Sequence, residues 1–428
     1  MQREIILLLQ EKASWESISK YLGKDLFQLD ITTEEIVINP DNNDTVGDGR
    51  IYVKRHTGIF IAGTSRTKIV YDQGAVVVSG QEMPVWELVL TRMSGRQSDF
   101  WDLTVHIAKK FKCILESRTY EQRATDTVNG VEFGRFHVKE FSSRTVEDAL
   151  HELIWWHLCG ISQASAELNL HAEDRLPVRR MRVEIRKLRA VLAMLDRVLD
   201  PDVQKWREKL RVLTIKLSRL REIDVALSAW RSTALNRRKY QRQSDKFSDF
   251  LVKERNMEKE KILPFFALTR LSPFLLEFMN WIMSDPIKET KENLLFDKIA
   301  HKKLGRWYNY MQKLFAENPD FKNDELAHEM RIKARSVRYL MQSMSGKAYG
   351  DENKIMRSLK RLLDALGVLH DNCVNEQLAK SVMRKQLSID VNYQAGIFTG
   401  NERGRAIRIR QMLPGLWEKF SADWEKWY

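Results

Sequence analysis

The residues of this chain that could do chemistry are arginines repeated every three or four positions in two separate segments. The segments Leu176–Arg189 and Glu325–Arg338 align without a gap at an offset of 149 residues. Their basic positions correspond one to one: Arg179 with His328, Arg182 with Arg331, Arg186 with Arg335, and Arg189 with Arg338. At about 100° per residue, offsets of 3, 4 and 3 keep the four positions within roughly an 80° arc of a helix. Each segment therefore predicts a helix with a basic stripe along one face.

The chemistry of such a stripe is the binding of anions. Guanidinium groups one turn apart repel each other unless a negative charge lies across them. Glu184 and Glu329, the acids within the two segments, point away from the stripe. The planar fork of arginine can also engage two phosphate oxygens at once. The pattern thus favours a phosphate-rich ligand.

Two alternatives stay open at this point. The arginines could pair with acids on other helices, for which Glu222, Asp224 and Asp371 are candidates, or they could form a solvated face. Apolar side chains occupy the neighbouring arc, Met181, Ile185, Leu188 and Leu192 in the first segment, which predicts that each helix buries one side in a core.

The composition points to the same class of partner. The chain of 428 residues has 71 Lys+Arg against 58 Asp+Glu, a formal charge of +13. Such an excess indicates nucleic acid, a lipid surface or a polyphosphate. No helix-turn-helix, RNA-recognition or zinc module is visible, so a nucleic-acid-binding protein is the weaker alternative. The three cysteines are far apart, and no apolar stretch reaches the roughly 18 residues of a membrane span, so we expect a cytoplasmic protein.

The first third of the chain has the glycine content and residue patterns of an α+β domain. Residues 1–146 contain ten of the 19 glycines. Runs at 58–63, 67–71, 75–79 and 85–90 predict strands of an antiparallel meander, with a turn at Asp72-Gln-Gly74. The spacing of apolar residues from Ser98 to Phe111 predicts a helix.

The rest of the chain predicts helices. Asn129-Gly130 and Gly134 mark a linker, and Pro177 suits the first turn of a helix. Leu217–Val225 matches Leu366–Val374 at the same offset of 149, which indicates a duplicated helical hairpin. We therefore expect an α+β domain with a partial antiparallel β tunnel or meander at 1–123, a linker at 124–146, and an all-α domain at 147–428. The all-α domain would consist of two pseudo-symmetric helical bundles, about 147–245 and 246–428.

These segments resemble the CHAD family, the α-helical domains named for conserved histidines. Its typical pattern is His-x-x-Arg-Val-x-x-Arg-Arg-Leu-Arg, followed by Leu-Gly-x-x-x-Asp on the partner helix. The second copy matches it at His328, Arg331, Arg335, Arg338, Tyr339, Leu366, Gly367 and Asp371. The first copy has Arg179 at the histidine position, and Ser218 and Glu222 in place of Gly and Asp. His370 occupies a variable position and is interpreted as an ordinary residue.

The resemblance implies two pseudo-symmetric four-helix bundles around a basic channel and an association with inorganic polyphosphate. Binding would be non-catalytic, and it would extend to association with polyphosphate granules. The phosphate-binding residues that it implies are Arg179, Arg182, Arg186, Lys187, Arg189, His328, Arg331, Arg335 and Arg338, together with Lys302, Lys303 and Arg306 of the preceding segment.

The first domain resembles a degenerate CYTH domain, the triphosphate-tunnel fold that precedes CHAD in bacterial CYTH–CHAD proteins. Tyr71–Gly74, Trp86–Leu90 and Met93–Gly95 carry this resemblance. Active members begin with Glu-x-Glu-x-Lys, but here only Glu4 of that pattern is present, and the later acidic strand keeps only Glu87.

A phosphoryl-transfer site requires metal-holding carboxylates and cations around the phosphates. The remnant site would comprise Glu4, Arg50, Lys54, Glu87 and Arg118. We expect no cofactor, and Mg²⁺ or Mn²⁺ only if this domain is active. The alternative function is a metal-dependent inorganic triphosphatase or polyphosphatase.

Overall fold

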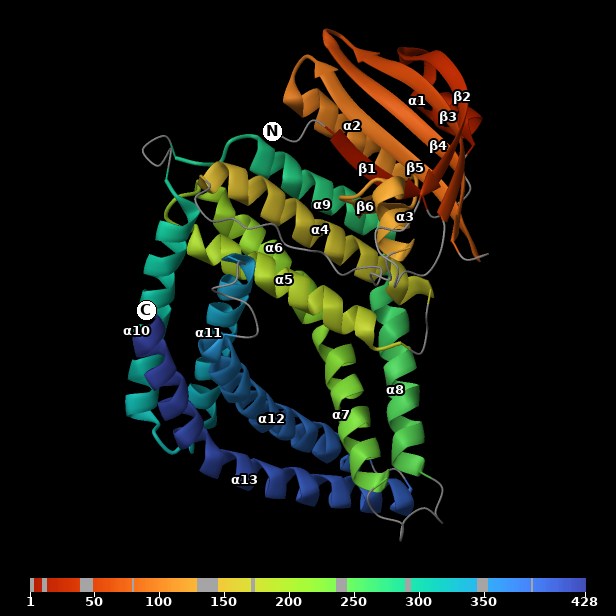
Figure 1. Ribbon diagram of the computed structural model, residues 1–428. Helices are drawn as coiled ribbons and strands as arrows, with labels where there is room; N and C mark the ends of the chain where they lie inside the picture. The colour runs from red at the N-terminus through yellow and green to blue at the C-terminus, as the bar shows by residue number, and fades with distance from the viewer. Residues whose placement is uncertain are drawn as a thin grey trace. The chain divides into compact units, whose positions relative to one another are not determined.

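The computed structural model describes residues 4–9, 14–38, 49–78, 81–128, 145–170, 174–235, 245–288, 294–344, 353–385 and 388–428. An antiparallel sheet is followed by a long series of helices, which confirms the prediction of an α+β region before an all-α domain (Figure 1). The chain forms two compact units. The sheet unit comprises Met1–His137, Glu147–Glu184 and Phe265–Ile287, and the helical unit comprises Val138–Val146, Ile185–Pro264 and Lys288–Tyr428.

The sheet has six strands in the order β2-β3-β4-β5-β1-β6. The strands are β1 (Glu4–Leu9), β2 (Leu26–Ile38), β3 (Gly49–Ala62), β4 (Ser65–Val78), β5 (Gln81–Ser94) and β6 (Cys113–Glu116). All neighbouring pairs are antiparallel. Of the predicted runs, 58–63 falls at the end of β3, both 67–71 and 75–79 fall in β4, and 85–90 falls in β5, whereas β2 was not predicted. Strand β1 inserts between β5 and the short β6.

The predicted turn at Asp72-Gln-Gly74 is wrong, because β4 continues straight through these residues. Asp72 lies opposite Arg55 and Gly74 opposite Val53 in an unbroken register with β3. A Cβ atom at Gly74 would overlap the carbonyl oxygen of Tyr52. The glycine therefore permits close approach of two strands and does not reverse the chain.

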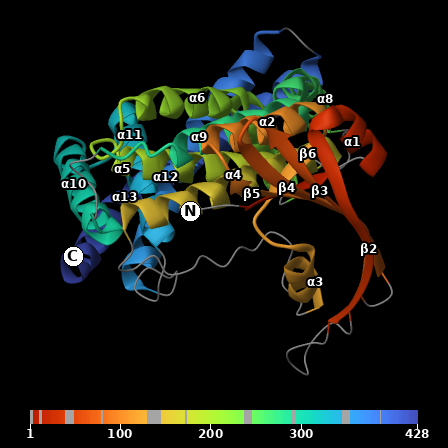
Figure 2. The same cartoon turned by 90° about the horizontal axis from the view of Figure 1, so that it is seen from above.

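Helices cover both faces of the sheet (Figure 2). Trp15 of α1 (Trp15–Leu22) stacks on His56 at 5.4 Å between ring centroids. Tyr120 and Ala124 of α3 (Tyr120–Val128) pack with Val53 in a buried cluster. Because side chains alternate along a strand, His56 and Val53 point to opposite faces. The predicted helix at 98–111 is confirmed as α2 (Gln97–Lys110).

Two later helices complete the sheet unit at its β6 edge. They are α4 (Val146–Leu170) and α9 (Leu268–Met283). The backbone N–H of Leu115 donates to Ser162 Oγ at 3.0 Å, and Ile114 packs against Ala166 and Leu268. An exposed edge strand would offer unpaired backbone groups, and these helices cover it.

The remaining described segments are nearly all helical, as predicted. They are α5 (Leu176–Met194), α6 (Asp202–Lys216), α7 (Ser218–Leu235), α8 (Lys246–Ile262), α10 (Phe296–Glu317), α11 (Asp324–Met344), α12 (Lys354–Met383) and α13 (Ile389–Trp427). Short 3-10 turns lie at Gly23–Asp25 and Leu263–Phe265. Pro177 is in the first turn of α5, as expected, and α5 crosses from the sheet unit to the helical unit after Glu184.

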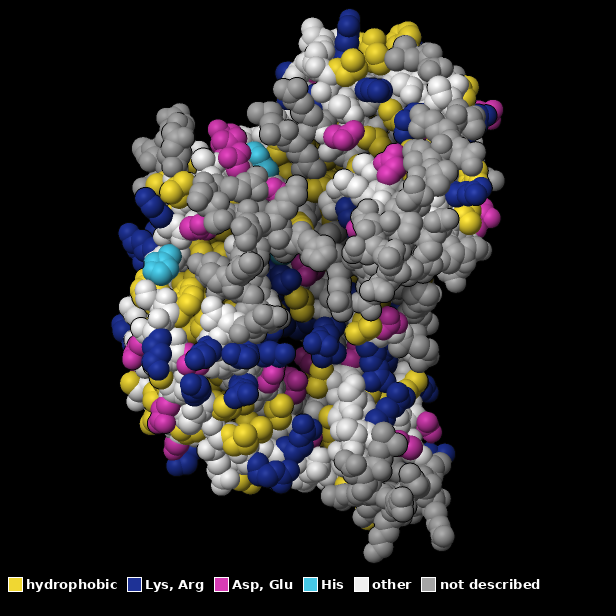
Figure 3. All heavy atoms as spheres, viewed as in Figure 1, with side chains coloured by type: hydrophobic (Ala, Val, Ile, Leu, Met, Phe, Trp, Pro, Cys, Tyr) yellow, Lys and Arg dark blue, Asp and Glu magenta, His cyan; other side chains and the backbone are white. Residues whose placement is uncertain are grey.

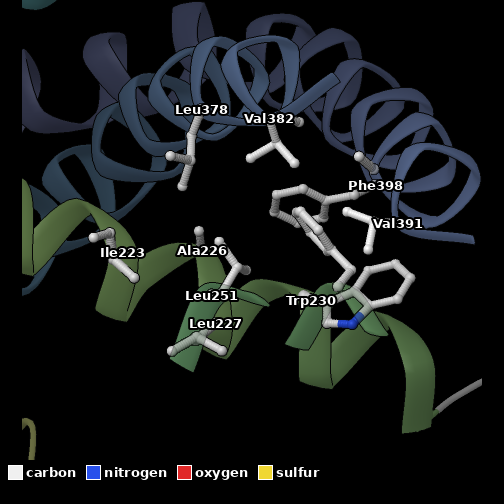
Figure 4. Close-up of a cluster of buried hydrophobic side chains, with 12 residues drawn as sticks. Ile223, Ala226, Leu227, Trp230, Leu251, Leu378, Val382, Val391 and Phe398 are labelled. Atoms are coloured by element: carbon white, nitrogen blue, oxygen red, sulfur yellow. The ribbon is translucent and has the colours of Figure 1, made fainter. Parts of the chain in front are cut away.

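An aromatic cluster forms one core of the helical unit (Figure 4). Trp230 of α7 meets Phe247 of α8 at 5.4 Å and Phe398 of α13 at 6.0 Å between ring centroids. Leu378 and Val382 of α12 belong to the same buried cluster. The cluster thus connects α7 of the first copy of the repeat with α12 of the second copy.

The repeat is visible in the helices themselves. At the offset of 149, α5 corresponds to α11 and the pair α6–α7 corresponds to α12. The first copy breaks at Leu217, whereas α12 continues through the equivalent Leu366.

The predicted domain boundaries stay a prediction. Helix α3 extends across residue 123, and most of the predicted linker, 129–144, lies outside the described residues. No single helix among the described residues is long and apolar enough to cross a membrane, while Lys246–Phe265 and Leu268–Met283 satisfy that criterion only as a bent pair.

Candidate functional site

The basic stripe of α11 lies beside a fully buried apolar stripe. Met330, Ala334 and Val337 are at most 1% exposed, which anchors the helix in its core. Arg331, Arg335 and Arg338 follow these residues by one position each and are half-buried. Since side chains at spacings of three and four share a helix face, the three guanidinium groups extend from one side of α11.

The second half of α5 presents the matching stripe in the helical unit. Ile185 and Leu188 are fully buried, and Arg186 and Arg189 beside them are half-buried. The charge of Arg186 lowers the pKa of both Arg331 and Arg335. The Arg186 side chain therefore lies near Arg331 and Arg335, a proximity between two helices that the sequence could not show.

We call Arg186, Arg189, Arg331, Arg335 and Arg338 the arginine cluster. In the space-filling view, Lys and Arg side chains gather over α11 and α12 beside a hollow in the helical unit (Figure 3).

Burial gives this cluster its unusual electrostatics. Desolvation lowers the pKa of Arg331 to about 10, although the charge of Asp371 opposes the shift. Burial also lowers the pKa of Arg335, and the charges of Arg331 and Arg186 add to that effect. Both guanidinium groups stay protonated at neutral pH, so the cluster concentrates positive charge in a region with little water.

Acids neutralise only a small part of this charge. Asp371 Oδ1 lies 3.7 Å from Arg331 Nη2. For the other four members of the cluster, the described residues provide no ion pair. The Nε atoms of Arg189, Arg331 and Arg338 are buried without a hydrogen-bond partner in the described part of the chain.

The other acids considered as partners are engaged elsewhere. Glu184 Oε2 lies 2.7 Å from His157 Nδ1, and Glu329 accepts a hydrogen bond from the Tyr310 hydroxyl. Asp224 pairs with Arg255 at 2.7 Å, and Glu222 lies 3.6 Å from Arg219. Among the described residues, an ion pair with an acid is therefore formed by one member of the cluster, Arg331.

A pair of histidines borders the cluster. His328 stacks on His370 with 4.9 Å between ring centroids, and His370 Nδ1 lies 3.3 Å from Asp371 Oδ1. Burial, together with the charges of His370, Arg331 and Arg335, lowers the pKa of His328. His328 is thus a neutral hydrogen-bond donor near pH 7. The interpretation of His370 as an ordinary residue stays a prediction, although its ring lies against that of His328 on another helix.

The other predicted phosphate-binding residues occupy varied positions. Arg179 is exposed and Arg182 is half-buried, and both lie in the half of α5 that belongs to the sheet unit. Lys187 is half-buried in the helical unit and takes part in other contacts. On α10, Lys302 and Arg306 are exposed, and Lys303 Nζ pairs with Asp196 at 3.2 Å.

Three further cations reach this region and were missed in the sequence. Arg207 of α6 acts on Arg189 of the cluster, Arg221 of α7 acts on Asp371, and Lys333 of α11 is affected by Arg207. Only the spacing of Arg207 and Arg211 on α6 could have indicated one of them, because the others depend on packing between helices.

In the sheet unit, the structure does not bring the predicted remnant residues together. Glu87 is buried, but Glu4 is exposed on β1. Arg50 and Lys54 are exposed on the face of β3 opposite to that of Arg55, whose partner Asp72 lies beside Glu87.

The charged groups of this face neutralise one another. Arg123 donates to Glu87 at 2.7 Å, and Arg55 makes two hydrogen bonds of 2.8 Å to Asp72. Arg118 pairs with Glu116 at 3.4 Å and with Asp126 at 2.7 Å. Desolvation, opposed by Arg123, raises the pKa of Glu87 to about 7. In the described part of the chain, no group of three or more His, Cys, Asp and Glu side chains could hold a metal ion.

The comparison with known families agrees with the helical site. The CHAD domain family matches residues 161–380, slightly more than half of the 428 residues. The chain belongs to the CHAD domain family. The match includes α5, α11 and the Asp371 region of α12, and thus every member of the arginine cluster.

Two solved structures are similar to this chain. PptA from Streptomyces chartreusis is 18% identical, with a TM-score of 0.49 over 64% of this chain and 99% of that chain. The CHAD domain from the plant Ricinus communis is 18% identical, with a TM-score of 0.45 over 68% of this chain and 94% of that chain. No curated protein matches the chain.

Proposed function

We propose that the helical unit binds inorganic polyphosphate, and that the phosphates lie across the arginine cluster without being cleaved. The observation that carries this proposal is the half-buried charge of Arg186 on α5 near Arg331 and Arg335 on α11, for which the described residues provide one ion pair, Arg331–Asp371. Membership of the CHAD family supports it. A linear polyanion supplies one negative charge after another, which matches cations that two facing stripes repeat at regular spacing.

The energetics favour collective binding. A charge-assisted hydrogen bond in a desolvated site contributes about 1.5–3 kcal/mol, whereas an exposed contact contributes a few tenths. The free protein holds like charges close together with buried Nε donors unsatisfied among the described residues. An anion relieves this repulsion on binding, so the arginines gain more from phosphate than isolated surface arginines would.

Charge reversal at Arg186 and Arg335 tests the proposal. We expect Arg186→Glu/Arg335→Glu to abolish binding of labelled long-chain polyphosphate, measured by fluorescence polarisation. The control is Arg180→Glu/Arg403→Glu, which changes the net charge equally at exposed arginines paired with Glu167 and Glu376. Unchanged affinity in the first variant, or equal loss in the control, would contradict the proposal.

A single substitution separates binding from folding. Arg335→Met removes a buried cation that has no ion pair among the described residues. Since burying an unpaired charge costs free energy, we expect this variant to melt at the same or a higher temperature while its affinity falls at least about tenfold. A lower melting temperature would show that Arg335 serves the fold.

We also propose that the six-stranded sheet with α1, α2 and α3 is a reduced CYTH domain that does not hydrolyse triphosphate. Its support is the row of charged side chains on one face, in which each acid already has an arginine partner. The test is phosphate release from tripolyphosphate with Mg²⁺ or Mn²⁺. Release that disappears in both Glu4→Ala and Glu87→Ala would establish the alternative function, a metal-dependent triphosphatase.

A cytoplasmic location and association with polyphosphate granules are part of the same proposal. A fluorescent fusion should colocalise with stained granules, and the Arg186→Glu/Arg335→Glu variant should be diffuse. Colocalisation that persists in this variant would assign granule association to another part of the chain.

A further inference from the structure

The carboxylate of Asp371 on α12 contacts the arginine cluster through a long ion pair. Its Oδ1 atom lies 3.7 Å from Arg331 Nη2, which is longer than the roughly 2.7–3.2 Å of an N–H···O hydrogen bond. The Arg331 side chain is 12% exposed, and its Nε is buried without a hydrogen-bond partner among the described residues. The pair therefore offsets the charge of Arg331 but leaves a buried donor unsatisfied.

The same carboxylate oxygen is held from its own helix. Asp371 Oδ1 lies 3.3 Å from Nδ1 of His370, the preceding residue. The His370 ring stacks on that of His328 of α11, with 4.9 Å between the ring centroids. One oxygen atom thus lies between an imidazole of α12 and a guanidinium group of α11. Because carboxylates and phosphates make the same charge-assisted hydrogen bonds to arginine, Asp371 and a bound phosphate are alternative partners of Arg331.

The first copy of the repeat directs the equivalent acid elsewhere. At the offset of 149, Glu222 of α7 corresponds to Asp371, and Arg219 corresponds to Val368. Glu222 lies 3.6 Å from Arg219, which is one turn earlier on the same helix. The second copy has an apolar residue at that position, so the counter-ion of its acid is Arg331 of another helix.

We propose that Asp371 is a built-in counter-ion that competes with the bound phosphates for Arg331. This inference rests on the proposed function and adds a regulation of the same site. A phosphate that approaches Arg331 must displace the carboxylate or lie beside a like charge, and both cost free energy. Asp371 thus stabilises the free protein by neutralising a buried cation, and it makes polyphosphate binding weaker and release faster than the cations alone would.

The test is Asp371→Asn, which removes the charge and keeps the shape of the side chain. We expect about tenfold tighter binding of long-chain polyphosphate in titration calorimetry, because the phosphates become the counter-ion of Arg331. The dissociation rate should fall by a similar factor, since most affinity changes at one interface appear in dissociation. The ligand then neutralises one more cation, so the slope of log Kd against log salt should steepen by up to about one.

Glu222→Gln is the matched control, because it removes the same charge from the equivalent position of the first copy. Its partner Arg219 lies outside the arginine cluster, so the affinity should stay within about twofold of that of the wild type. The melting temperature is an independent measurement. Asp371→Asn should lower it in the free protein, since Arg331 is left buried without a counter-charge, and polyphosphate should raise it more than in the wild type.

A double-mutant cycle shows whether Asp371 acts through Arg331. In an Arg331→Gln background the cation is gone, so Asp371→Asn should increase the affinity by less than about twofold. This background also keeps the test decisive if Asp371→Asn alone does not fold, because it removes the uncompensated cation together with the acid.

Three outcomes would overturn the competition. They are weaker or unchanged binding in Asp371→Asn, an equal gain in Glu222→Gln, and an undiminished gain in the Arg331→Gln background. Failure of the underlying function looks different, because the wild type would then not bind polyphosphate, or Arg186→Glu/Arg335→Glu would bind it normally.

Discussion

At the scale of single residues, the free protein holds like charges close together. His328 faces three positive or potentially positive groups, His370, Arg331 and Arg335, and burial adds to their effect, so the pKa of its imidazole is lowered. Asp371, the acid beside this group, is itself kept ionised by a hydrogen bond from His370 and by Arg331, which outweigh its burial and lower its pKa. Bound phosphates would change the electrostatic environment of His328 from positive to negative.

The affinity for polyphosphate should depend on pH through His328. Bound phosphates favour the imidazolium form, so they raise the pKa of His328 and binding takes up a proton. Affinity should therefore increase as pH falls through the pKa of His328 in the complex, by at most about tenfold for each pH unit. It should level off below the lowered pKa of His328 in the free protein. Titrations between acidic and neutral pH measure this dependence, and His328→Asn should reduce it. A variant with the slope of the wild type would show that another group titrates.

At the scale of the elements, β4 shows how one glycine determines the shape of the sheet. Because a Cβ at Gly74 would overlap the Tyr52 carbonyl, Gly74→Ala must separate β3 from β4 beside the Arg55–Asp72 pair. We expect a loss of about 2–4 kcal/mol in the free energy of unfolding, measured by denaturant titration. Gly63→Ala provides a comparison, because Gly63 is strained by its φ of 59° but has open space around it. A Gly74→Ala variant as stable as the wild type would mean that the strands adjust at little cost.

At the scale of the whole molecule, the formal charge of +13 attracts any polyanion, so charge alone does not establish specificity. The arginine cluster is half-buried. By the proposed function a single linear chain reaches these guanidinium groups, and we expect a rigid duplex to reach fewer of them because it is wider. We therefore expect long-chain polyphosphate to stay bound in the presence of excess duplex DNA or ATP. Competition between labelled polyphosphate and these ligands measures this selectivity. If DNA displaces polyphosphate equally well, the basic surface attracts polyanions only through its overall charge.

The sequence by itself determined the features that depend on local periodicity. The two stripes, the helices that carry them and the helix at 97–110 follow from residue spacing, because a helix repeats its faces every 3.6 residues wherever it packs. The relation between the copies also follows, since the offset of 149 pairs α5 with α11.

Only the tertiary structure decided which groups meet. It turned Arg186 towards Arg331 and Arg335, stacked His328 on His370, and left Asp371 as the one acid that pairs with the cluster among the described residues. It also brought the charge of Arg207 close enough to affect both Arg189 and Lys333. These contacts join residues far apart in the chain, and their charges and burial depend on how whole helices pack. Spacing along the sequence carries no information about that packing.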